Sequence, residues 1–153
     1  MKQISTPDAP AAIGPYCQAM RAHGFIFTSG QIPLNPKTGE IEGSTIEEQS
    51  EQVMKNLQAV LEAAGSDLEH ALKTTCYLAD IADFAAFNEV YAKYFTGKPA
   101  RSCFAVKDLP KGAKLEVEVI ALCKKGPDHN PEHGCKHGHK GHGHHGHHKP
   151  AEE

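Results

Sequence analysis

Two segments of the chain place chemically useful side chains where a strand would set their direction. In Pro99-Ala100-Arg101-Ser102-Cys103, an arginine enters a predicted strand directly after a rigid Pro-Ala pair. A planar guanidinium at that point could bind a small carboxylate through two parallel hydrogen bonds. Glu116 lies in the middle of another predicted strand, on the face opposite Leu115 and Val117, where its carboxylate could orient a water molecule. From spacing alone, a surface arginine and a solvated glutamate are the alternatives.

Common catalytic motifs are absent from the sequence. It contains no G-x-S-x-G, no phosphate-binding glycine loop, no H-E-x-x-H and no dinucleotide fingerprint. Before the C-terminal segment, the only histidines are His23, at a predicted turn, and His70, after a predicted helix, and we expect both to be exposed. This argues against a Ser-His-Asp mechanism. Acid–base chemistry would then fall to carboxylates, tyrosine, cysteine or backbone groups.

The composition divides the chain of 153 residues into two parts. Residues 126–153 contain nine of the eleven histidines and no Leu, Ile, Val, Met, Phe or Tyr. Such a segment cannot bury enough apolar surface to fold, whereas residues 1–125 have ordinary globular composition. We therefore predict one folded domain over 1–125 and a disordered His-rich tail over 126–153.

Charge, hydropathy and cysteine usage exclude several classes of protein. The chain shows no apolar run of about 18 residues, which a membrane-spanning helix needs, and no secretory signal. Residues 1–125 carry 13 basic and 15 acidic residues, so nucleic acid and membrane surfaces are not expected partners. An odd number of cysteines, five, without a C-x-x-C motif indicates a reducing compartment, and we expect a cytoplasmic protein.

Apolar periodicity predicts the elements that must position these side chains. His23-Gly24 reads as a tight hairpin turn, and Thr45-x-x-Glu48 or Ser44-x-x-Glu47 as a capping box at a helix start. Gln3-Ile4-Ser5 reads as a short edge strand or an extended arm. The predicted elements are strands 16–22 and 25–29, a helix 44–65, a strand 72–78, a helix that begins near Asp80 or Asp83 and ends at Phe95, and strands 102–106 and 114–122.

This order predicts an α+β fold: a two-layer domain in which two helices cover one face of a four- or five-stranded sheet. The last two strands would form a hairpin of unknown register. If Arg101 and Glu116 share a sheet face, the alternation of a strand places Cys103 there too. The other face of the sheet is not uniformly polar, so we expect a symmetric partner to cover it.

Several motifs together resemble the reactive-intermediate deaminase (RidA, formerly YjgF) family. The resemblance extends over about residues 3–124, in order and without evident gaps, and does not include the tail. The motifs that carry it are Pro99-Ala100-Arg101-Ser102-Cys103, Leu109-Pro110-Lys111, Leu115-Glu116-Val117-Glu118, Ala9-Pro10-Ala11-Ala12-Ile13-Gly14-Pro15-Tyr16, Thr28-Ser29-Gly30-Gln31-Ile32-Pro33, Asn35-Pro36-Lys37-Thr38-Gly39-Glu40, residues 56–65, Lys73-Thr74-Thr75, and Asn88 within 84–95.

The resemblance implies a chorismate-mutase-like fold, a homotrimer with active sites between subunits, and hydrolysis of 2-aminoacrylate-type enamine or imine acids to 2-oxo acids and ammonium, without a cofactor. It assigns Arg101 to the substrate carboxylate, Glu116 to the water and Tyr16 to the site. Ser29 and Gly30 would contact substrate, or simply make a turn; Asn88 would support the site, or brace its helix. Cys103 would line the site rather than act as nucleophile, since no histidine is predicted to activate it. Some members of the family are described as endoribonucleases or translation inhibitors, which leaves that function as an alternative.

The tail predicts a second kind of chemistry, because clustered imidazoles bind Ni²⁺, Zn²⁺ and Cu²⁺. A metal buffer or carrier built on the folded domain is therefore the rival function. A purification tag is the other explanation, but tags usually carry about six contiguous histidines and the longest run here is two. The candidate ligands are His133, Cys135, His137, His139, His142, His144, His145, His147 and His148.

Overall fold

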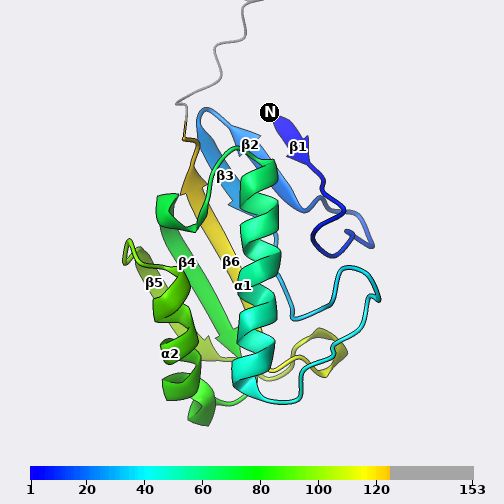
Figure 1. The fold of residues 1–153 in the computed structure, drawn as a ribbon, viewed down its shortest axis with the longest axis vertical. Helices are drawn as coiled ribbons and strands as arrows, with labels where there is room; N and C mark the ends of the chain where they lie inside the picture. The colour runs from blue at the N-terminus through cyan, green and yellow to red at the C-terminus, as the bar shows by residue number, and fades with distance from the viewer. Residues whose placement is uncertain (125–153) are drawn as a thin grey trace, which may run out of the picture.

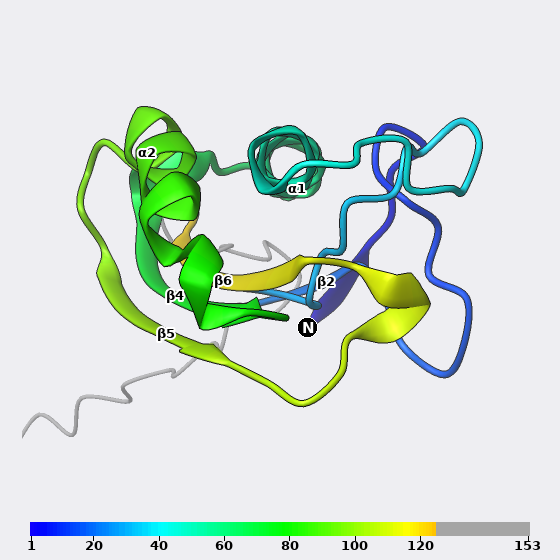
Figure 2. The same ribbon diagram turned by 90° about the horizontal axis from the view of Figure 1, so that it is seen from below.

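Two helices pack side by side on one face of a six-stranded sheet (Figures 1 and 2). The computed structural model describes residues 1–124. No helix within those residues is long and apolar enough to cross a membrane. The elements are β1 (Lys2–Ile4), β2 (Ala19–Ala22), β3 (Phe25–Thr28), α1 (Ile46–Ala63), β4 (Ala71–Leu78), α2 (Phe84–Tyr94), β5 (Ala100–Ala105) and β6 (Leu115–Leu122), with short 3-10 helices at Leu68–His70, Ile81–Asp83 and Pro110–Gly112.

The α+β class is confirmed, and the number of strands is corrected. The sheet has the order β1-β2-β3-β6-β4-β5, where four or five strands were expected. The additional strand is β1, which pairs antiparallel with β2 through Lys2↔Arg21 and Ile4↔Ala19. The N-terminal segment is thus an edge strand rather than a free arm. Three residues are too short to show strand periodicity, so the pairing with β2 decides their conformation.

The expected hairpin between the last two strands is wrong. β5 runs parallel to β4 at the sheet edge, and β6 runs antiparallel to β4 on its other side, so β4 separates them. A parallel pair needs a crossover connection, and α2 provides it between β4 and β5. The chain then passes across the sheet end and returns between β3 and β4 as β6.

Helix α1 forms where its caps and its apolar stripe were predicted. The Thr45 side chain accepts a hydrogen bond from the Glu48 backbone N–H, and the Glu48 carboxylate accepts one from the Ser44 N–H. Gly65 follows the helix with a φ of +85°, a conformation that suits glycine. The buried side chains of α1 that face the sheet include Val53, Met54, Leu57, Val60 and Leu61.

The first hairpin turns where expected, but its first strand is shorter. His23 and Gly24 both have positive φ, which matches the twist of a two-residue hairpin turn. β2 begins at Ala19, so Tyr16, Cys17 and Gln18 lie outside the strand that the apolar run predicted. These three residues instead continue the N-terminal loop, which accepts hydrogen bonds from Ser29 of the candidate site.

The sheet face away from the helices has no covering element among the described residues (Figure 2), and it is partly apolar. Phe25 and Phe27 on β3, Phe104 on β5 and Leu122 on β6 are 39–47% exposed there. β6 alternates as predicted, with Leu115 and its alternate neighbours buried under the helices and Glu116 on the open face. The prediction that the helices leave a partly apolar face uncovered is therefore confirmed.

Candidate functional site

The guanidinium of Arg101 has a defined position at the edge of the sheet. Arg101 lies on β5, and its Nη1 donates a hydrogen bond of 2.6 Å to Oδ1 of Asn88 on α2. Its Cζ lies 4.7 Å from the ring centroid of Tyr91 and 5.5 Å from that of Phe84. These three residues of α2 are spaced by four and three positions, so they share the helix face that looks toward β5. Arg101 is itself exposed, and a carboxylate can reach it from solvent.

Cys103 lies on the same face of β5 as Arg101, because the two are two residues apart in a strand. Its partner across the parallel ladder is Cys76 of β4, a buried thiol. Burial raises the pKa of Cys103, and it raises the pKa of Cys76 to about 12. Both groups are therefore thiols at neutral pH, which favours a lining role over a nucleophilic one.

Glu116 and Gly30 meet on the open face of the sheet. Gln31 exchanges two backbone hydrogen bonds with Val117, which brings the chain just after β3 against β6. A Cβ built on Gly30 would lie only 2.7 Å from Cδ of Glu116, so only glycine fits at this position without a shift. Burial, followed by the negative charge of Glu118, raises the pKa of Glu116. A half-buried carboxylate of raised pKa is a suitable proton acceptor for a water molecule.

Between β3 and the Gln31 bridge, the chain has one residue more than the facing part of β6. Phe27 pairs with Ile120, but the next backbone pair joins Gln31 to Val117, so three residues face two. The Thr28 hydroxyl accepts a hydrogen bond from the Val119 N–H inside this bulge. The bulge is the local reason why Gly30 approaches the Glu116 side chain.

Ser29 connects this bulge to the loop that carries Tyr16. The Ser29 hydroxyl donates to the Cys17 carbonyl at 2.6 Å, and its N–H donates to the Gln18 carbonyl at 2.9 Å. The hydroxyl therefore has a structural partner twelve residues earlier in the chain, rather than one within a local turn. Tyr16 itself is 55% exposed and has no side-chain hydrogen bond among those found in residues 1–124.

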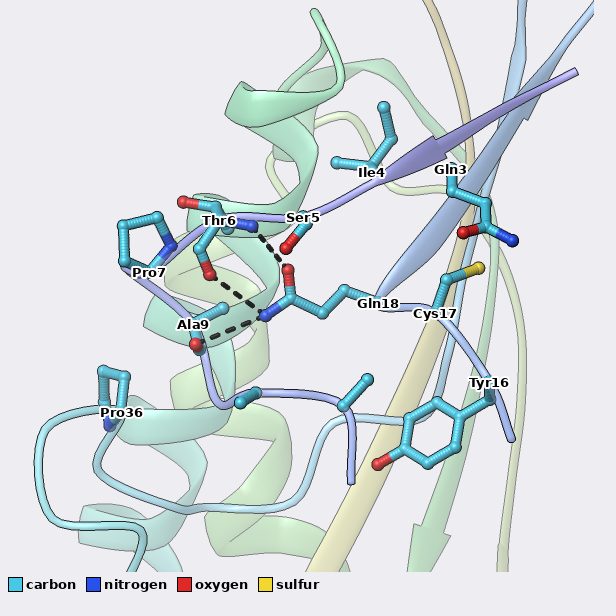
Figure 3. Close-up of a pocket in the computed structure, with 12 residues that line it drawn as sticks. Gln3, Ile4, Ser5, Thr6, Pro7, Ala9, Tyr16, Cys17, Gln18 and Pro36 are labelled. Carbon is cyan, nitrogen blue, oxygen red and sulfur yellow. Dashed lines mark hydrogen bonds between the residues drawn. The ribbon is translucent and has the colours of Figure 1, made fainter. Parts of the chain in front are cut away.

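Hydrogen bonds from the buried side-chain amide of Gln18 hold the loop before Tyr16 in place (Figure 3). Its Oε1 accepts from the Thr6 N–H, and its Nε2 donates to the carbonyls of Thr6, Ala9 and Pro10. A cavity of about 620 Å³ lies beside this loop, and Tyr16 and Cys17 are among its lining residues. Gln18 thus holds Thr6, Ala9 and Pro10 of the loop that leads to Tyr16.

The predicted site residues fall into two groups that one chain does not bring together. Arg101 pairs with Thr74 of β4, whereas Glu116 pairs with Tyr77. Positions 74 and 77 are an odd number of residues apart, so their side chains point to opposite faces of the sheet. Arg101, Asn88 and Cys103 lie on the helix side at the edge, and Glu116 with Gly30 lies on the open face. The condition that Arg101 and Glu116 share a face is not met.

Some residues that shape the site were missed by sequence reasoning. Tyr91 falls within the predicted helix that ends at Phe95 and has no site role in the sequence analysis, although its ring lies under the Arg101 guanidinium. Gln18 was included in an apolar stretch. Asn56, on α1, donates to the carbonyls of Ile32 and Leu34 and so fixes the chain beyond Gly30. For Gln18 and Asn56, the sequence offered one signal of a structural role: each is a polar residue whose neighbours along the strand or helix are buried.

The candidate metal ligands of the tail lie outside the described residues. Within residues 1–124, no group of three or more His, Cys, Asp or Glu side chains is placed to hold a metal ion.

The chain is similar to one protein family and to several named proteins. The model of the family described as Endoribonuclease L-PSP matches residues 6–123. The chain is 46% identical over 127 residues to the mouse (Mus musculus) 2-iminobutanoate/2-iminopropanoate deaminase, an alignment covering 82% of this chain and 93% of the mouse protein. It is 50% identical over 119 residues to Reactive Intermediate Deaminase A, chloroplastic, of Arabidopsis thaliana, covering 77% and 64% of the two chains.

Among solved structures, E. coli TdcF with bound serine superposes with a TM-score of 0.76 at 43% identity. The alignment covers 80% of this chain and 98% of TdcF. The six-stranded sheet with two helices on one face is thus the architecture of an experimentally determined relative.

Proposed function

The chain belongs to the Endoribonuclease L-PSP family, which includes proteins named as imine deaminases, and from this premise we propose that it hydrolyses 2-imino and enamine acids to 2-oxo acids and ammonium. The observation that carries the proposal is the guanidinium of Arg101, oriented by Asn88 and Tyr91 at an exposed edge. A planar donor in a fixed orientation suits the carboxylate that every such substrate carries. TdcF, whose structure contains bound serine, is a relative that binds a small amino acid.

The chemistry needs little beyond orientation and a proton acceptor. Arg101 pairs with the substrate carboxylate and so fixes the adjacent C=N carbon. Glu116 takes a proton from water as the water oxygen bonds to that carbon, and returns this proton to the nitrogen as the C=N electron pair moves there. Glu116 then carries the hydroxyl proton of the tetrahedral intermediate to the amino nitrogen. The C–N bond breaks as the C=O bond of the 2-oxo acid forms, and the released ammonia takes a proton from solvent to become ammonium. General-base assistance of this kind contributes about 10²–10⁴-fold, and no cofactor enters the balance.

We place this site between two chains of a homotrimer. Arg101 and Glu116 lie on opposite faces of their own sheet, so one substrate cannot contact both within a chain. Glu116 lies on the face where Phe27 and Leu122 are exposed. We propose that a second copy covers these side chains and contributes its Arg101 to the same site. Light scattering at micromolar concentration should give three chains, and an active monomer would contradict the arrangement.

The other site residues that the family resemblance singled out have supporting roles in this proposal. The Tyr16 hydroxyl, on an exposed ring, meets substrate from the chain that contributes Glu116. Gly30 leaves room beside Glu116 and offers a backbone N–H to the substrate. Cys103 lines the site next to Arg101, and Asn88 orients the guanidinium.

The test is a coupled assay with a serine or threonine dehydratase, which releases the unstable imine. Wild type should accelerate formation of the 2-oxo acid, in the presence of a chelator as well as without it. Arg101→Ala should lose the acceleration, and Arg101→Lys should be poor because one ammonium cannot reproduce the planar pair of donors. Turnover near wild type in Arg101→Ala would overturn the proposal. Cleavage of RNA that survives in Arg101→Ala would favour the endoribonuclease function that the family description names.

We propose in addition that residues 126–153 bind Ni²⁺, Zn²⁺ or Cu²⁺, separately from the hydrolysis. The support is the composition of the segment, nine histidines and Cys135 among many glycines. The two activities use different parts of the chain, so either can be present without the other.

A further inference from the structure

A chain of contacts joins the buried ladder of the sheet to the exposed Arg101 guanidinium. The Tyr91 hydroxyl and the Thr74 hydroxyl share a buried hydrogen bond of 2.7 Å. The face of the Tyr91 ring lies 4.7 Å from Cζ of Arg101. Thr74 is also the residue directly opposite Arg101 in the parallel β4–β5 ladder. Tyr91 therefore reaches the strand neighbour of Arg101 with its hydroxyl and Arg101 itself with its ring.

We propose that Tyr91 is the positioning residue for Arg101: its ring holds the guanidinium by a cation–π contact, and its bond to Thr74 fixes the ring. The inference rests on the proposed function in taking Arg101 as the group that binds a substrate carboxylate. It assigns Tyr91 no contact with the substrate. It adds a residue whose role is to set the direction of the guanidinium before substrate arrives.

The ring of Tyr91 is itself held on several sides. It stacks on Phe95 at a centroid distance of 4.5 Å and lies against Phe87 at 5.6 Å. Tyr91 is buried, and burial raises the pKa of its hydroxyl, so the group stays protonated and keeps its bond to Thr74. A ring packed in this way offers Arg101 a fixed surface rather than a mobile one.

Arg101 needs such a surface because it lies on an exposed edge strand. An arginine side chain that is free in solvent samples many rotamers, and ordering it on binding costs conformational entropy. The Asn88 Oδ1 contact fixes one nitrogen, and the Tyr91 face restricts the plane of the guanidinium. Loss of Tyr91 should therefore weaken carboxylate binding, raising KM more than it lowers kcat.

The test is a calorimetric titration of the full-length protein with 2-oxobutanoate, a carboxylate of the product class. Tyr91→Leu should weaken binding about two- to five-fold, the range that a cation–π contact at an exposed site implies. Tyr91→Phe keeps the ring but loses the Thr74 bond and should have a smaller effect, which Thr74→Val should reproduce. Tyr94→Leu is the matched control, because Tyr94 lies on the same helix, bonds to Glu51 and makes no contact with Arg101 among those found.

A second readout does not depend on ligand. In wild type, the Arg101 δ-methylene protons should show an upfield ring-current shift by NMR. This shift should decrease in Tyr91→Leu, where only the more distant Phe84 ring remains near the guanidinium, and persist in Tyr91→Phe and Tyr94→Leu. The inference is overturned if Tyr91→Leu binds 2-oxobutanoate as tightly as Tyr94→Leu, if the NMR shift is absent in wild type, or if wild type does not bind 2-oxobutanoate. If wild type binds 2-oxobutanoate but does not accelerate imine hydrolysis, the proposed function fails while the positioning role of Tyr91 is still decided by the variants.

Discussion

Gly30 and the Glu116 carboxylate are in such close contact that a methyl group at Gly30 would lie 2.7 Å from the Glu116 Cδ. The contact arises from the bulge after β3 and the bridge between Gln31 and Val117. The position of the Glu116 carboxylate, the proposed proton acceptor, therefore depends on residue 30 having no side chain.

Gly30→Ala should displace Glu116 and lower kcat/KM for imine hydrolysis by about 10- to 100-fold, because small misplacements of a catalytic group cost that much. Gly30 does not have a positive φ, so the added methyl should not strain the backbone. Thermal unfolding should therefore change little. Wild-type kinetics in this variant would show that Glu116 tolerates displacement and is not the acceptor.

A site shared between chains predicts complementation. Arg101→Ala and Glu116→Gln should each be inactive alone. When the two proteins are unfolded together and refolded at equal ratio, cyclic symmetry gives about a quarter of the sites an intact Arg101 from one chain and an intact Glu116 from the next. Activity should return to about that fraction of wild type. No recovery in verified mixed trimers would mean that one chain supplies both groups.

Hydrolysis should decline as the pH falls through the raised pKa of Glu116, because only the ionised carboxylate accepts a proton. Burial raises this pKa, and the charge of Glu118 raises it further. Glu118→Gln removes the like charge, so the acidic limb of the pH–rate profile should move to lower pH. Glu47→Gln, on α1 across the sheet, is the control and should leave the limb in place. A limb unchanged by Glu118→Gln would assign it to another group.

Asp67 caps the short helix Leu68–His70 and should contribute stability that acid removes. It accepts from the His70 backbone N–H at 3.0 Å and from Lys124 Nζ at 3.0 Å. Desolvation raises its pKa, but the hydrogen bonds from His70 and Lys124 outweigh this and lower the pKa from 3.8 to about 2.

Asp67→Ala should lower the free energy of unfolding by about 1 kcal/mol near neutral pH. Since the folded-state pKa is depressed, this contribution is fully present above the unfolded value of 3.8 and is lost as pH falls toward about 2. Urea unfolding at one fixed protein concentration should show the difference between wild type and variant shrinking over that interval. A difference independent of pH would exclude the carboxylate charge as its source.

Removal of residues 126–153 should abolish most Ni²⁺ or Zn²⁺ binding and leave imine hydrolysis intact. Imidazole must be neutral to bind a metal, so uptake by the full chain should weaken as pH falls through about 6.5. Calorimetric titration of the full chain and of a chain ending at Lys125 tests both points. Equal metal binding by the shortened chain would refute a metal-binding tail, and loss of hydrolysis on truncation or chelation would refute its independence.

Local patterns in the sequence were enough to predict most of the helices and strands, and which face of the last strand packs against the helices. The alternation through 115–122 and the stripe and cap of residues 44–65 depend on interactions within a few residues, so they appear in the sequence itself. The family motifs also single out Arg101 and Glu116 as residues with a common function. The structure does not test that function, which stays a prediction.

The relation between those two residues was decided only by tertiary structure. Strand neighbours depend on which connections cross the sheet, and β4 comes between β5 and β6 although β5 and β6 are consecutive in the chain. A register that pairs Arg101 with Thr74 and Glu116 with Tyr77 sends their side chains to opposite faces. The contact of Tyr91 with Arg101 likewise joins a helix to a strand through packing, which no periodicity in either segment encodes.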